Sequence, residues 1–169
     1  MRRHDYDPST RIISLRMPGP VHEAVASRVA TVVRGQLGLL SKDIRSPLAA
    51  VIAGIEHLGY SGVCFQGRAG LVTKQPDISF WNKGTRYPRV VVEVAYSCRR
   101  KNLEQLAHDY ITSLPGRVAV VVGIDLPYCK KKSILSVWRA TLVKEMGTTS
   151  VKCELVASEV CRNPNGRKT

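Results

Sequence analysis

Apolar residues follow two different periods along the chain, and the period changes near residue 60. From Val21 to Leu40 they recur at spacings of three and four, which predicts an amphipathic helix over 21–40. Pro47 suits the first turn of a second, shorter helix over 47–58. A strand is expected over 11–17, before both helices. It should end at Pro18-Gly19-Pro20, a segment that cannot be helical throughout.

After residue 60 the pattern indicates strands. Residues 90–96 form a continuous apolar run, typical of a central strand that is covered on both faces. A helix over 99–114 and a second apolar run over 118–124 follow, so these two strands should be parallel. Further strands are expected over 60–66, 77–81, 134–140 and 151–160, with a weak extended piece over 71–73. The expected fold is α/β, with a mixed central β-sheet flanked by helices.

Composition adds one departure from the average globular protein. The chain has 169 residues, 44% of them apolar, and 26 Lys and Arg against 13 Asp and Glu, a net charge of +13. These values exclude a chain that is disordered over its whole length. They suit one domain over 1–162, followed by a short, flexible basic tail over 163–169. The surplus charge favours a polyanionic partner, nucleic acid ahead of an anionic membrane, although a merely soluble basic protein stays open.

The chain shows no targeting or membrane signal. Residues 1–8 lack the apolar core of a signal peptide, and no apolar run is long enough to cross a bilayer. The five cysteines include no CxxC pair, so neither a disulfide framework nor a zinc site is predicted. An intracellular location, cytoplasmic or nuclear, is expected.

Two acidic residues stand out, because they are the only ones between residues 57 and 103. Asp77 and Glu93 each fall in a strand that is otherwise apolar. Burying an ionised carboxylate costs several kcal/mol unless a cation compensates it. Either a basic side chain, Lys101 or Arg99, pairs with Glu93, or the two carboxylates hold a hard divalent metal. For Asp77, a simple turn cap after Pro76 is the alternative.

An ordered series of segments carries a resemblance over most of the chain, from about residue 6 to about residue 139. It comprises residues 16–23, 75–77, 91–97, 100–103, 107–111, 120–125 and 135–139. The series resembles the PD-(D/E)XK, or restriction-endonuclease-like, nuclease superfamily, and within it a group of small domains from bacterial and, in a related form, fungal genomes. The resemblance implies a mixed sheet flanked by helices in the order α, β, β, β, α, β.

The resemblance also implies a metal site. Asp77 and Glu93 would bind Mg²⁺ or Mn²⁺, with the backbone carbonyl of Val94 completing the coordination. Glu23 would be an accessory catalytic acid, although a first-turn acid that complements the helix dipole is the alternative. For His22, a contact with substrate or assistance with proton transfer is one reading, and a plain polar contact at the helix start is the other.

The catalytic lysine of the superfamily is missing from its usual place. A conventional member has Lys two residues after the Glu, where this chain has Ala95. Lys101 is the remaining catalytic candidate, with Arg100 as a substitute cation. The signature is therefore incomplete.

Basic residues surround this part of the chain. Those expected to contact nucleic acid are Arg99, Arg100, Lys74, Lys83, Arg86, Lys130 and Lys131, with solvated surface as the alternative. The expected function is Mg²⁺-dependent cleavage of nucleic-acid phosphodiester bonds, DNA ahead of RNA, with a homodimer left open. The alternative is an inactive protein of the same fold that binds nucleic acid or a protein partner.

Overall fold

The computed structural model describes residues 3–43, 45–58, 62–67, 69–96, 103–114, 116–126, 132–145 and 148–162. The tail over 163–169 lies outside the described residues. The elements are β1 (Arg3–Asp7), β2 (Ile12–Arg16), α1 (Pro20–Leu40), α2 (Ala49–Ala53), β3 (Ile55–His57), β4 (Val63–Gly67), β5 (Gly70–Lys74), β6 (Ile78–Asn82), β7 (Val90–Ala95), α3 (Leu103–Ser113), β8 (Val120–Asp125), β9 (Ser133–Glu145) and β10 (Thr148–Arg162).

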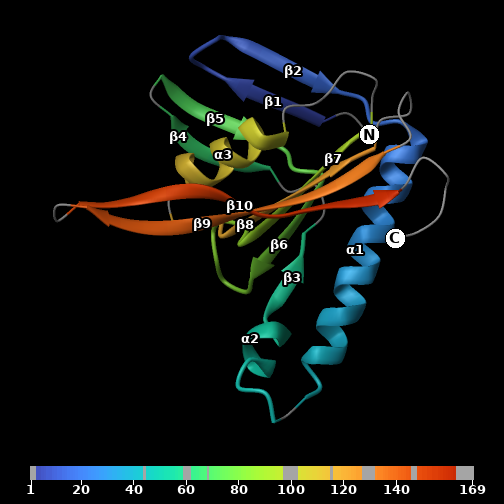
Figure 1. The fold of residues 1–169 in the computed structure, drawn as a ribbon. Coiled ribbons are helices and arrows are strands. Elements are labelled where there is room, and N and C mark those ends of the chain that lie inside the picture. The colour runs from blue at the N-terminus through green and yellow to red at the C-terminus, as the bar shows by residue number, and fades with distance from the viewer. Residues whose placement is uncertain are drawn as a thin grey trace.

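A six-stranded sheet forms the centre of the molecule, in the order β10-β9-β8-β7-β6-β3 (Figure 1). β7 runs parallel to β8 and antiparallel to β6, so the sheet is mixed. From Val91 to Ala95 the strand β7 is buried throughout. The α/β class, the central apolar strand and its parallel partner are therefore confirmed.

Side chains alternate between two separate cores because successive residues of a strand point to opposite faces. On β7, Val92 and Val94 pack with Ala26 and Ala30 of α1. Val91, on the other face, packs with α3 and with Val63, Phe65 and Val72 of β4 and β5. The long helix α1 thus covers one face of the sheet, and α3 covers the other (Figure 1).

Four strands form a second sheet, antiparallel, in the order β2-β1-β5-β4. The sequence pattern indicated one mixed sheet, so this division is a difference from the prediction. β1 was not predicted, because the charged and polar residues Arg3-His4-Asp5-Tyr6-Asp7 carry no apolar alternation. β5 is a full five-residue strand that pairs with both β4 and β1.

Two other boundaries differ from the prediction. The helix expected over 47–58 ends at Ala53, and after Gly54 the chain pairs with β6 as β3. The strands expected over 134–140 and 151–160 are longer, and together they form the antiparallel hairpin β9–β10. Within the described part of the chain, none of the helices has the length and apolar character needed to cross a membrane.

Candidate metal and phosphodiester site

Glu93 is the most deeply buried acid of the site, with 1% of its surface exposed. It lies on β7 on the same face as Val91, toward α3. The hydroxyl of Tyr110, on α3, donates a hydrogen bond of 2.9 Å to its Oε1. Nη1 of Arg16, at the end of β2, donates one of 3.2 Å to its Oε2. Both carboxylate oxygens therefore have a donor.

Asp77 is also buried, in the residue directly before β6. Its Oδ2 accepts a 2.6 Å hydrogen bond from the backbone N–H of Val94 and lies 3.0 Å from Nε2 of His22. Its Oδ1 lies 3.8 Å from Nη1 of Arg16. These contacts explain how an apolar strand region accommodates a second carboxylate.

His22 connects α1 to this pair. Its Nε2 lies 3.0 Å from Oδ2 of Asp77 and 3.1 Å from the carbonyl oxygen of Val94. Both of these neighbours accept hydrogen bonds, so Nε2 carries the proton that it shares between them. Its Nδ1 is buried and has no hydrogen-bond partner among the described residues. The structure thus shows a polar contact of His22 near the start of α1, and this contact orients Asp77.

Arg16 is the cation of the site. Besides Glu93 and Asp77, its guanidinium contacts Oδ1 of Asp5 at 3.0 Å and the carbonyl oxygen of Gln75. Burial alone would lower the pKa of Arg16. The nearby carboxylates of Glu93, Asp5 and Asp77 raise it by more than burial lowers it, so the pKa is above its ordinary value. Arg16 is therefore always charged here. The sequence pattern did not single it out.

The two carboxylates share one cation position. Protein donors hold one oxygen of each carboxylate, Oε1 of Glu93 and Oδ2 of Asp77. The second oxygen of each, Oε2 of Glu93 and Oδ1 of Asp77, faces the same atom, Nη1 of Arg16. Carboxylate oxygens are the donors that Mg²⁺ prefers, and it often binds with only two of them plus water and substrate phosphate. The donor set fits such an ion once Nη1 moves aside. Among the described residues no cluster of three or more His, Cys, Asp or Glu side chains is arranged to hold a metal.

The other predicted site residues are placed as follows. Glu23 lies half-buried in the first turn of α1, next to His22, a position that suits either role considered for it. Ala95, at the place of the conventional lysine, is buried. The carbonyl of Val94 faces His22. Lys101 lies outside the described residues, as do Arg99, Arg100, Lys130 and Lys131.

Three of the predicted nucleic-acid contacts are described. Lys74 makes an ion pair of 2.7 Å with Asp109 and lies 5.5 Å from the ring centre of Tyr110, so it borders the site rather than open solvent. Lys83 and Arg86 are exposed in the turn between β6 and β7. These two are available to an external phosphate, whereas Lys74 already has an anion.

Arg16 and Tyr110 are the site residues that sequence reasoning did not find. Tyr110 was assigned only to the apolar stripe of its helix, where it packs in the core as expected. A charged residue at the end of an otherwise apolar strand was the available signal for Arg16, of the same kind that identified Glu93. Its partner could not be inferred, because the two lie in different sheets.

No protein-family model matches the chain, and no curated protein matches it either.

Proposed function

We propose that this chain is a nuclease-like domain of the restriction-endonuclease-like class, which uses Mg²⁺ or Mn²⁺ to cleave phosphodiester bonds of nucleic acids, DNA ahead of RNA. One observation carries the proposal. Oε2 of Glu93 and Oδ1 of Asp77 converge on one cation position, while their other oxygens are held by Tyr110, His22 and the backbone of Val94. This is pre-organisation of a carboxylate pair toward a cation.

Asp77, Glu93 and the carbonyl of Val94 would hold the metal. When bound, the ion supplies Lewis-acid stabilisation of charge on the phosphate and lowers the pKa of a coordinated water. The protein's own part is orientation: Tyr110 fixes Glu93, and His22 with the Val94 N–H fixes Asp77. Arg16, moved from between the carboxylates, remains a charged donor suited to a phosphate oxygen.

Net charge supports the choice of a nucleic-acid substrate. At +13 the chain attracts polyanions, and Lys83 and Arg86 are exposed. They lie in the turn that joins β6 to β7, at the opposite end of these two strands from Asp77 and Glu93, so they would contact a long polyanion away from the carboxylate pair. Lys101 stays the proposed catalytic lysine, in place of the one missing at Ala95.

A second candidate rests on Arg16 itself. A guanidinium between the two carboxylates already offsets part of their negative charge without a metal. In addition, Ala95 stands where a conventional member has its lysine. These two features favour an inactive member that binds nucleic acid through its basic surface.

The deciding experiment incubates supercoiled plasmid and single-stranded RNA with the protein in Mg²⁺, Mn²⁺ or EDTA. Cleavage that needs the metal and is lost in Asp77→Asn and in Glu93→Gln supports the proposal. Glu159→Gln, at an exposed position of β10, is the matched control and should cleave normally. Cleavage that persists in both site variants would come from a contaminant and would overturn it.

A binding measurement then separates the two candidates. Metal binding is followed as a rise in Tm with Mg²⁺, in wild type and in Arg16→Met, which leaves the carboxylates without their cation. The nuclease proposal expects the rise to be larger in Arg16→Met and absent in Asp77→Asn. No metal effect in either protein, together with nucleic-acid affinity that falls steeply with salt, would establish the inactive binder.

A further inference from the structure

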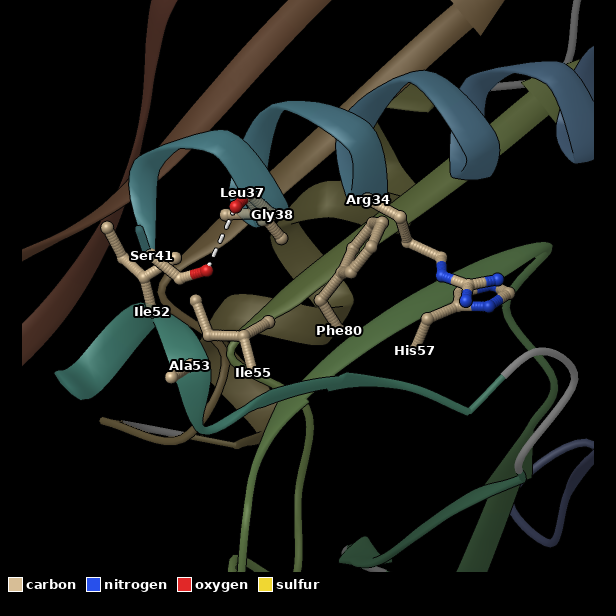
Figure 2. A pocket seen from close by; sticks show the side chains of 9 residues that line it. All are labelled: Arg34, Leu37, Gly38, Ser41, Ile52, Ala53, Ile55, His57 and Phe80. Carbon is tan, nitrogen blue, oxygen red and sulfur yellow. Dashed lines mark hydrogen bonds between the residues drawn. The ribbon is translucent and has the colours of Figure 1, made fainter. Parts of the chain in front are cut away.

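A pocket of about 190 Å³ lies at the far end of α1 from the carboxylate pair, between α1, α2 and the edge of the large sheet formed by β3 and β6 (Figure 2). His22 and Arg34 are 12 positions apart on α1. At about 1.5 Å per residue that is about 18 Å along the helix axis. The pocket is therefore separate from the candidate metal site.

One end of the pocket is polar. Arg34, on α1, and His57, on β3, point toward one another there (Figure 2). Among the described residues Arg34 makes no ion pair and no side-chain hydrogen bond, and no acid lines the pocket. A cation on the wall of a hollow without an anion beside it is suited to an anion from outside.

His57 does not add a second charge at neutral pH. Burial, and then the nearby charge of Arg34, lower the pKa of its imidazole below the ordinary value of 6.5. Its ring also contacts Phe80, with the ring centres 5.5 Å apart. Arg34 thus carries a single positive charge, and His57 offers a neutral hydrogen-bonding group beside it.

The other end of the pocket is lined mainly by the aliphatic side chains of Leu37, Ile52 and Ile55, from α1, α2 and β3, and Phe80 lies between them and the polar end (Figure 2). The hydroxyl of Ser41 also lies at this end, where it donates a hydrogen bond of 3.1 Å to the carbonyl oxygen of Gly38. Aliphatic walls favour an aliphatic group, which releases water from them when it binds. The polar and apolar ends together describe an amphiphilic ligand with its charge at one end.

We propose that this pocket binds a small organic carboxylate with an aliphatic body. The guanidinium of Arg34 pairs with the carboxylate, and the aliphatic body lies against Leu37, Ile52 and Ile55. One cation beside a neutral imidazole matches the single charge of a carboxylate better than the double charge of a phosphate. The site goes beyond the proposed nuclease function and does not depend on it.

The test is titration calorimetry or NMR with hexanoate at neutral pH. We expect binding by wild type, at least about tenfold weaker binding by Arg34→Gln, and unchanged binding by Arg28→Gln. Arg28 and Arg34 are both exposed on α1, so neither change should disturb folding, and the Tm of each unliganded variant checks this. Equal affinity of wild type and Arg34→Gln would overturn the proposal.

Three further probes examine the chemistry of the ligand. Hexan-1-ol and hexylamine have the same aliphatic body without the negative charge, and both should bind at least tenfold more weakly than hexanoate. Hexyl phosphate carries the same body on a phosphate. If the alcohol or the amine binds as well as hexanoate, or if hexyl phosphate binds much more tightly, the carboxylate assignment is wrong.

Discussion

Arg16 and Glu93 are 77 positions apart and belong to different sheets, yet Nη1 of Arg16 lies 3.2 Å from Oε2 of Glu93. The buried acid of the large sheet is thus compensated by a cation from the small sheet. The contact joins the sheets electrostatically, in addition to the apolar core that they share through Val63, Phe65 and Val91.

Removing the cation should destabilise the fold. Arg16→Met leaves the buried carboxylates of Glu93 and Asp77 without their positive partner, and we expect a loss of about 3–5 kcal/mol in the free energy of unfolding. Urea unfolding measures it. Arg86→Met, at an exposed position, should change the free energy by less than about 0.5 kcal/mol. Equal effects of the two variants would mean that the Arg16 contacts do not stabilise the protein.

Tyr110 should be held neutral and hydrogen-bonded. Burial, followed by the charge of Glu93 and the hydrogen bond to it, raises the pKa of Tyr110 well above its ordinary value of 10.0. A folded-state pKa above the unfolded one gives stability that is complete below pH 10 and is lost as the pH rises through the folded pKa. Tyr110→Phe should cost about 1–3 kcal/mol at neutral pH and lessen this alkaline loss.

Alkaline titration of tyrosine absorbance checks this expectation. Of the six tyrosines of wild type, one should ionise only as the protein unfolds, and Tyr110→Phe should lack that late component. If all wild-type tyrosines ionise together near pH 10, the buried hydrogen bond to Glu93 is not maintained in solution.

His57 should titrate below the ordinary histidine range. Burial and the charge of Arg34 lower its pKa from 6.5, so the stability that it contributes is present above pH 6.5 and is lost as the pH falls through the folded pKa. NMR titration of the imidazole protons measures that pKa, and Arg34→Gln should shift it part of the way back toward 6.5. A pKa that is the same in the two proteins would place Arg34 away from His57.

Gly123 should not accept a larger side chain. It lies on β8 opposite Glu93, and a Cβ there would stand 2.8 Å from Cζ3 of Trp138 and 3.1 Å from Cδ1 of Leu103. Because both neighbours are buried, Gly123→Ala should lower stability by about 1–3 kcal/mol. Gly35→Ala, in α1 with nothing within 4 Å, should instead raise the Tm. Thermal unfolding measures the Tm of both variants, and a Tm of Gly123→Ala equal to that of wild type would contradict the prediction.

Elements with a strong apolar pattern were predictable from the sequence. The helix α1 and the parallel pair β7 and β8 follow from apolar periodicity, which reflects burial directly. β1 and β3 were missed, because each is held by pairing with a distant strand rather than by a pattern of its own. The division into two sheets was missed for the same reason, because it depends on which distant strands pair and not on a local sequence pattern.

The acids of the candidate site were predictable, whereas their neighbours were not. Asp77 and Glu93 stand out because a charge in an apolar strand is costly. Arg16 and Tyr110 reach Glu93 from a second sheet and from a helix, and only the folded arrangement brings them there. The sequence therefore showed that a compensating group was needed without showing which one.

The strand that carries Arg16 is at the edge of its sheet, with β1 as its neighbour there. Edge strands open in local fluctuations that cost far less than global unfolding. Fraying of β2 would withdraw the guanidinium and leave the rest of the fold intact, so the carboxylates on the large sheet become reachable from solvent without melting the core. The free energy of such a local opening would then set how often solvent reaches the two acids.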